Sequence, residues 1–234
     1  MRGAGSDAVL AIDSSTRDAY VAVEVDGTLA AEEAVTARAN ASSALLPAVD
    51  RAVRAAGLAP GDLSAVVVGG GPGSFTGLRI AAATAKGIVR AVGVPLYAYS
   101  GLLAAAAAHR DGDAAVCALF DARNREVFAG CWRFAAGPRE VLGVTAAGID
   151  DIMERLRGER VRFVGEGAAL HRTLLADAFG AEAVAGEERS PAHGLLWLAR
   201  TVPEHGRVAD AAAWEPDYVR AAGVERMAAA RGAG

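Results

Sequence analysis

The order of strand-like and helix-like segments in the first hundred residues constrains the fold of this chain most strongly. Three segments have the apolar or alternating pattern of strands: residues 9–12, 19–25 and 28–35. Asp26-Gly27 between the last two is a hairpin turn signal, so an antiparallel meander is expected. Helix-like and strand-like segments then alternate: 42–56, 65–68, 74–92 and 96–99. This order predicts an α/β fold in which a mixed sheet is flanked by helices.

The second half of the chain repeats this order less clearly. Strands are expected at 114–120, 126–134, 139–144 and 161–164, and helices at 101–109, 149–156, 168–179 and 192–201. A meander followed by alternating helix and strand is the order of the ribonuclease-H-like core in actin-like and sugar-kinase-like proteins. We therefore expect two lobes, an N-terminal lobe at 1–100 and a degenerate C-terminal lobe at 101–234. Whether the last helices pack back on the first lobe is left open.

The composition favours a globular protein and argues against several classes. Hydrophobic residues make up 53% of the chain, and the net charge of −4 gives no basic excess that would hold a nucleic acid alone. No apolar run reaches the roughly 18 residues of a membrane-spanning helix, and the N-terminus lacks a signal-peptide pattern. Cys117 and Cys131 lie in apolar stretches and are expected to be buried thiols. These features fit a cytoplasmic protein.

The turn after the first strand, Asp13-Ser14-Ser15-Thr16, is the first candidate site. In phosphotransferases of this architecture, such a turn offers N–H groups and hydroxyls to a phosphate, and the aspartate holds a metal ion or its water. Asp13, Ser14 and Ser15 are therefore candidate nucleotide-binding residues of an ATP-binding phosphotransferase or ATPase. The structural alternative is an aspartate that caps a tight turn, and these four residues alone favour that alternative.

A glycine-rich segment at 70–77 precedes the second helix, and it reads Gly-Gly-Pro-Gly-Ser-Phe-Thr-Gly. It lacks the lysine of a Walker loop, and Ser74 is placed to cap the helix. Within that helix Gly77, Ala81 and Ala85 recur every four residues and form a stripe without bulk. Such a stripe lets another helix approach closely, or it packs internally against the sheet. The sequence does not decide between these two readings.

Several blocks, in a fixed order, resemble the TsaB (YeaZ) family: 11–15, 71–80 with 85–87, 121–123 with 125–128, and 216–220. The Gly-Pro-Gly-Ser-Phe-Thr-Gly block is the most specific of them. The resemblance implies a two-lobed, non-catalytic scaffold subunit in the cytoplasm. Such a subunit binds and activates TsaD, its paralogue, which transfers the threonylcarbamoyl group to adenosine 37 of tRNA (t6A modification). The resemblance also implies that the ATPase TsaE joins the assembly, that a homodimer forms when TsaD is scarce, and that tRNA is contacted only through the complex.

The resemblance places the partner surface on the helix pair at 42–56 and 74–92 of the first lobe. In the first helix, Leu45, Leu46, Val49 and Val53 are expected to share one apolar face. In the second helix, Leu78 and Ile88 are expected to be exposed apolar contacts, with Arg79 and Lys86 at the rim. The full set of candidate partner-binding residues is Ser74, Phe75, Leu78, Arg79, Ala81, Ala85, Lys86 and Ile88.

The same resemblance argues against an enzyme. A TsaD-like site needs two histidines one helical turn apart on one metal ion, and the alignment puts Gly101 and Ala105 at those positions. No metal site and no catalytic residue are therefore expected, and a glycoprotease-like metallopeptidase is disfavoured. The turn at 121–125 has no glycine to cradle a phosphate, and only Gly165-Glu166-Gly167 remains of an adenosine-binding loop. No cofactor is expected, although weak ATP or ADP binding stays open.

Overall fold

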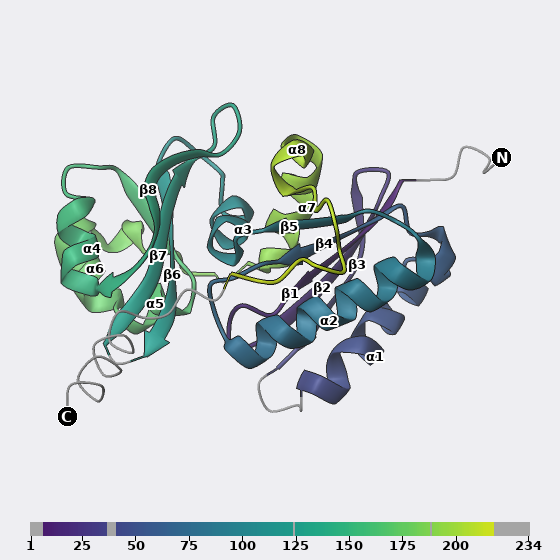
Figure 1. Ribbon diagram of the computed structural model, residues 1–234. Helices are drawn as coiled ribbons and strands as arrows, with labels where there is room; N and C mark the ends of the chain where they lie inside the picture. Colours follow the sequence, from purple (N-terminus) through teal and green to yellow (C-terminus); the bar gives the residue numbers. More distant parts are fainter. Residues whose placement is uncertain (1–6, 37–40, 124, 188, 218–234) are drawn as a thin grey trace, which may run out of the picture.

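A computed structural model describes residues 7–36, 41–123, 125–187 and 189–217. It contains two sheets side by side, each covered by helices (Figure 1). The first has five strands in the order β3-β2-β1-β4-β5, and the second has four in the order β8-β7-β6-β9. This arrangement confirms the expected two-lobed α/β fold with mixed sheets.

The first sheet begins with an antiparallel meander, as the hairpin signal predicts. Its strands are β1 (Ala8–Asp13), β2 (Ala19–Val25), β3 (Thr28–Val35), β4 (Ala65–Gly69) and β5 (Leu96–Tyr99). β2 pairs antiparallel with β1 and β3, while β4 runs parallel to β1 and β5 parallel to β4. β1 is buried along its whole length, which agrees with its continuous apolar sequence.

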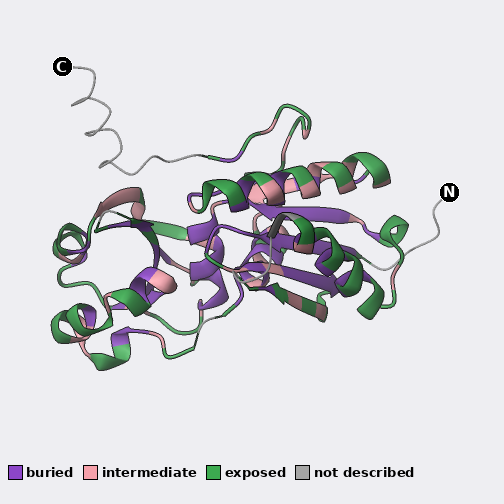
Figure 2. Ribbon diagram, turned by 90° about the horizontal axis from the view of Figure 1, so that it is seen from below, coloured by how far each residue is buried: buried purple, intermediate pink, exposed green. Residues whose placement is uncertain are grey.

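Two helices cover one face of this sheet, α1 (Ala41–Ala55) and α2 (Phe75–Val92). Their inner faces are buried and their outer faces are exposed (Figure 2). Leu45, Val49 and Val53 of α1 are buried in the core of this lobe, as expected, because they recur every four residues. Leu46 is 58% exposed, so its assignment to the same face is wrong. One residue of a helix turns the side chain by about 100°, which carries Leu46 away from the sheet.

The second sheet has the same antiparallel start. Its strands are β6 (Ala115–Arg123), β7 (Glu126–Arg133), β8 (Arg139–Gly148) and β9 (Val161–Val164), and β9 runs parallel to β6. The helices and short turns of this half are α3 (Gly101–Ala108), α4 (Ile149–Arg155), α5 (Glu166–Leu170), α6 (Arg172–Phe179) and the 3-10 turn Ala181–Ala183. The single helix expected at 168–179 is therefore two helices that meet at His171.

The chain then returns to the first sheet. α7 (Pro191–Thr201) packs against β1, β2 and β4 on the face opposite α1 and α2, and it also packs against α3. α8 (Pro203–Gly206) follows beside β5, and the backbone N–H of Val208 donates to the carbonyl of Leu96. The first lobe also contains the short 3-10 turn Pro60–Asp62. Within the described residues, no helix has both the length and the apolar character needed to cross a membrane.

Candidate functional site

Asp13 closes β1 and is completely buried. One carboxylate oxygen accepts the backbone N–H of Ser15 at 3.0 Å, and the other accepts the Ser15 hydroxyl at 3.0 Å. Burial raises the pKa of Asp13, and the two hydrogen bonds from Ser15 oppose that rise. Ser14 and Thr16 are buried as well. The turn is therefore closed on itself by its own aspartate, as the structural alternative predicts.

The glycine-rich segment packs directly on this turn. The backbone N–H of Ser74 donates to the Ser15 carbonyl at 2.8 Å. A Cβ atom at Gly73 would overlap that same carbonyl oxygen, and one at Gly77 would overlap the carbonyl oxygen of Ser14. The glycines at these two positions therefore permit a close approach of two backbones. In this arrangement the start of α2 covers the turn that a phosphate would occupy in a phosphotransferase.

Two further glycines close the site around Asp13. A Cβ atom at Gly69 would overlap the Asp13 carboxylate, and one at Gly101 would overlap the Ser15 hydroxyl. Gly101 is one of the two positions to which the resemblance assigns a metal ligand in TsaD. The Ser15 side chain occupies the space that a side chain at position 101 would need.

The second lobe adds a negative charge to this region. The Glu166 carboxylate accepts the backbone N–H of Arg17 at 3.4 Å, which joins α5 to the turn after β1. A carboxylate at this place disfavours a phosphate by like-charge repulsion. The corresponding β6–β7 turn has no glycine. Instead, Asp121 accepts the backbone N–H of Arg123, and Arg123 and Arg125 both have positive φ angles.

Metal-binding groups do not converge in the described part of the chain, where no group of three or more His, Cys, Asp or Glu side chains could hold an ion. His109, which ends α3, is buried, and its Nε2 accepts the backbone N–H of Arg189 at 3.3 Å. Burial, and after it the nearby Arg189 and Arg162, lower the pKa of His109 to about 4. This histidine therefore acts as a neutral acceptor inside the protein.

The small-residue stripe of α2 faces inward. Gly77, Ala81 and Ala85 are buried, and the two alanines belong to the core of the first lobe. Leu78 is only 1% exposed, so the expectation that it forms an exposed contact is wrong. It shares the inner face of α2 with Ala81 and Ala85, three and seven residues further on, and its place is against the glycine-rich segment.

The outer face of α2 carries other candidates. Ser74 is exposed and caps the helix by accepting the N–H of Gly77. Phe75 is 53% exposed, and the exposed Arg79 holds its guanidinium 4.1 Å above the Phe75 ring. Leu46 is exposed on the neighbouring helix α1, and we call the exposed side of these two helices, with Leu46, Ser74, Phe75 and Arg79, the α1–α2 surface. Leu46 was expected on the apolar face of α1 and not among the exposed candidates, although it is offset by one residue from the four-residue repeat of Leu45, Val49 and Val53.

Two other residues of α2 are less accessible than expected. Ile88 is half-buried and packs against the core of the first lobe. The Lys86 ammonium donates to the Ala212 carbonyl at 3.2 Å and lies 3.3 Å from a carboxylate oxygen of Glu215. Lys86 therefore holds the segment after α8 against α2, a role that the sequence did not suggest.

Comparisons with known proteins agree on one family. A family model described as "TsaD: tRNA N6-adenosine threonylcarbamoyltransferase" matches residues 34–193. "tRNA threonylcarbamoyladenosine biosynthesis protein TsaB" of Bacillus subtilis is 32% identical over 222 residues, which cover 93% of this chain and 96% of that protein. The protein of the same description from Escherichia coli is 35% identical over 122 residues, covering 51% and 52% of the two chains.

Solved structures give the same result. A Pseudomonas aeruginosa protein described as uncharacterized, with similarity to peptidase YeaZ, superposes with a TM-score of 0.74 at 29% identity. The match covers 92% of this chain and all of that one. A second structure, YeaZ from the same organism, gives a TM-score of 0.72 at 26% identity. Sequence and fold therefore agree over nearly the whole length, and this chain belongs to the TsaB family.

Proposed function

We propose that this chain is a non-catalytic subunit in threonylcarbamoyladenosine biosynthesis on tRNA, acting in the cytoplasm by binding and activating TsaD. The observation that carries the proposal is the similarity to the Bacillus subtilis TsaB over 93% of the chain. The match of residues 34–193 to the TsaD family supports a common architecture for the two partners. Two related folds can pair through equivalent surfaces, so the same surface also serves a homodimer.

The absence of catalysis is supported by the packing around Asp13. The carboxylate is bonded within its own turn, the glycine-rich segment covers that turn, and Glu166 brings a second carboxylate to it. A phosphotransferase needs this region open for a phosphate and its metal ion. We therefore expect at most weak ATP or ADP binding around Asp13, Ser14 and Ser15, with no cofactor required.

The α1–α2 surface is the proposed partner contact. It offers an exposed aromatic ring and an exposed leucine, Phe75 and Leu46, with Arg79 over the Phe75 ring. Exposed large apolar groups rimmed by a charge are typical of protein interfaces. Leu78, Ala81 and Ala85 contribute by holding α2 against the sheet, and Ile88 and Lys86 flank the surface. Through this contact, binding would stabilise the active arrangement of TsaD by mass action.

The test is a binding and modification assay with charged variants of the exposed residues. Phe75→Asp combined with Leu46→Asp should abolish co-purification with TsaD. It should also abolish t6A formation in a reaction with TsaE, threonylcarbamoyl-adenylate and tRNA. Leu170→Asp is the matched control, because Leu170 is 66% exposed but lies in the second lobe. Circular dichroism should show the same fold for all variants. Retention of the TsaD complex by the double variant would contradict the surface, and t6A formation without this chain would contradict the function.

A further inference from the structure

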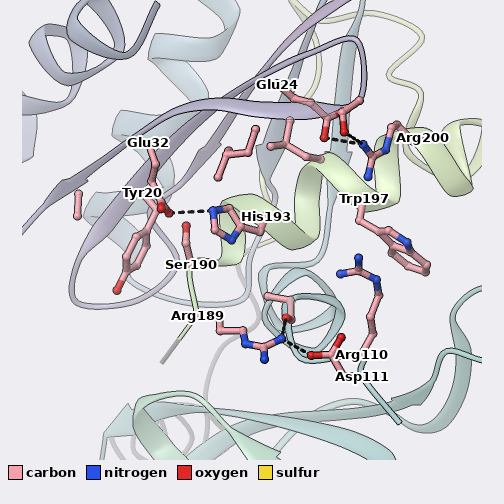
Figure 3. Close-up of a pocket in the computed structure, with 15 residues that line it drawn as sticks. Tyr20, Glu24, Glu32, Arg110, Asp111, Arg189, Ser190, His193, Trp197 and Arg200 are labelled. Atoms are coloured by element: carbon pink, nitrogen blue, oxygen red, sulfur yellow. Dashed lines mark hydrogen bonds and ion pairs between the residues drawn. The ribbon is translucent and has the colours of Figure 1, made fainter. Parts of the chain in front are cut away.

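A cavity lies on the face of the first sheet opposite the α1–α2 surface. It has a volume of about 760 Å³, and its walls are β2, β3, the segment after α3, and one face of α7 (Figure 3). This volume is within the range of small-molecule binding sites. We call it the α7 pocket. The residues that line the α7 pocket do not include the turn at Asp13, so the two sites are separate.

One end of the α7 pocket is rich in arginine. Arg189 and Arg200 line it, and each is already engaged by a carboxylate: Arg189 by Asp111, and Arg200 by the buried Glu24 at 2.6 Å. These two ion pairs leave the local charge balanced. The net charge at this end of the pocket therefore depends on a third arginine.

Arg110 is that third arginine. It donates to the Ala107 carbonyl at 3.0 Å, and its guanidinium lies 5.0 Å from the centre of the Trp197 ring. Among the described residues it forms no ion pair. Burial lowers the pKa of Arg110, and the nearby Arg200 and Arg189 lower it further against the opposing effect of Asp111. A guanidinium in this position gains from an oxyanion, which it can bind through two parallel N–H groups.

The other end of the α7 pocket has a different character. Ser190 occupies the N-cap position of α7, yet its hydroxyl does not cap the helix. Its side chain points toward Glu32 and His193 in Figure 3. The residue is 8% exposed, and its hydroxyl has no hydrogen-bond partner among the described residues. The Glu32 carboxylate lies 3.2 Å from Nε2 of His193, and the Tyr20 ring stands beside it. A buried hydroxyl next to a carboxylate suits a ligand that brings hydroxyl or amino groups.

We propose that the α7 pocket binds a nucleotide, with its phosphate on Arg110 and the hydroxyl or amino groups of its nucleoside facing Ser190 and Glu32. The two ends fit one molecule because an anion alone satisfies only the arginine end. The Tyr20 ring, which stands beside Glu32, provides a flat apolar surface for a base, while the Trp197 ring packs under the Arg110 guanidinium. A free nucleotide and a nucleotide within an RNA strand share this chemistry, and the experiment separates them. The proposal does not depend on the interaction with TsaD.

The experiment uses the full chain and adenosine monophosphate as the probe, with inorganic phosphate and adenosine as partial probes. Affinity is measured by calorimetry. The binding position is found from the NMR signals of the indole N–H groups of the three tryptophans, and the Trp197→Phe variant assigns the signal of Trp197. The nucleotide should bind at least tenfold more tightly than either partial probe, and the signal of Trp197 should shift most. Binding that shifts no Trp197 signal, or no binding at millimolar concentration, overturns the proposal.

One variant at each end of the α7 pocket tests which groups of the nucleotide bind there. Arg110→Gln and Ser190→Ala should each weaken nucleotide binding about tenfold, which is the loss of one charge-assisted or buried hydrogen bond. The Ser190→Ala protein is expected to fold, because the hydroxyl makes no hydrogen bond to any residue that the structure describes. Arg54→Gln is the control, since Arg54 pairs with Asp50 on the distant α1. Unchanged affinity in Arg110→Gln, with circular dichroism showing a folded protein, would also overturn the proposal.

A short single-stranded RNA distinguishes the two sources. If it binds more tightly than the free nucleotide and loses affinity in the same two variants, the pocket takes a nucleotide of an RNA strand. If the free nucleotide binds more tightly, the pocket serves a free nucleotide. RNA binding that is insensitive to both variants, without any nucleotide binding, contradicts the proposal for either source.

Discussion

At the scale of single residues, the glycines around Asp13 determine how the first lobe is built. Gly73 and Gly77 are required because carbonyl oxygens of the β1 turn occupy the space that a side chain would need. The sequence showed that glycines cluster before the second helix, and it made the turn at Asp13 a candidate phosphate site. It did not show what fills the space beside them, because that depends on a contact between segments sixty residues apart.

Two glycines of the same helix provide a matched test of this interpretation. Gly77→Ala should lower the free energy of unfolding by about 2–3 kcal/mol, because the added Cβ collides with the Ser14 carbonyl. Gly87→Ala should raise it by about 0.5–1 kcal/mol, because nothing lies within 4 Å and alanine is the better helix former. Urea unfolding of both variants measures the difference. Equal changes in the free energy of unfolding would show that the contact with the Ser14 carbonyl does not require glycine at position 77.

At the scale of elements, the sequence predicted strands better than helix faces. The bounds of β2, β3, β5 and β9 match the expected segments, because alternation and turn residues are local signals. The orientation of α2 was misjudged at Leu78, because the small-residue stripe fits an external or an internal neighbour equally well. The break at His171 was missed because no proline or glycine marks it. The candidate partner surface therefore lies on the two helices that the sequence indicated, but different side chains are exposed on it.

The junction between α3 and α7 predicts a pH dependence of stability. His109 has a pKa of about 4 in the folded protein, against about 6.5 in an unfolded chain. The folded state therefore binds fewer protons, so its stabilisation is complete above about pH 6.5 and is lost as the pH falls toward 4. The free energy of unfolding should decrease by about 2 kcal/mol more in the wild type than in His109→Gln over this range.

Urea unfolding at several pH values measures this difference. Glutamine keeps an acceptor for the Arg189 N–H but has no proton to gain. If the free energy of unfolding of the two proteins varied with pH in the same way, protonation of His109 would not destabilise the folded protein. Asp111 opposes the effect of Arg189 and Arg162 on His109, so replacing it with Asn should lower the pKa of His109 further.

At the scale of the whole molecule, the segment after α7 connects the two faces of the first sheet. α7 lies on one face of the sheet, and the segment 208–217 crosses to the other, where it contacts α2 and the glycine-rich segment. The backbone N–H of Asp217 donates to the Gly70 carbonyl at 2.7 Å. The resemblance identified 216–220 only as a family block, and its described part acts here as a clamp on the start of α2, while 218–220 lie outside the described residues.

Lys86 is the side chain that should reveal whether this clamp supports the α1–α2 surface. Lys86→Met removes the bonds to Ala212 and Glu215, and it should lower the free energy of unfolding by about 0.5–1 kcal/mol. The larger effect should be local, because the segment then opens without global unfolding. Trypsin should cleave after Arg207 several times faster, whereas Arg90→Met, at the exposed end of α2, should leave the rate unchanged. If the clamp supports partner binding, TsaD affinity should fall together with protease resistance. Faster cleavage with unchanged affinity would separate the clamp from the docking surface.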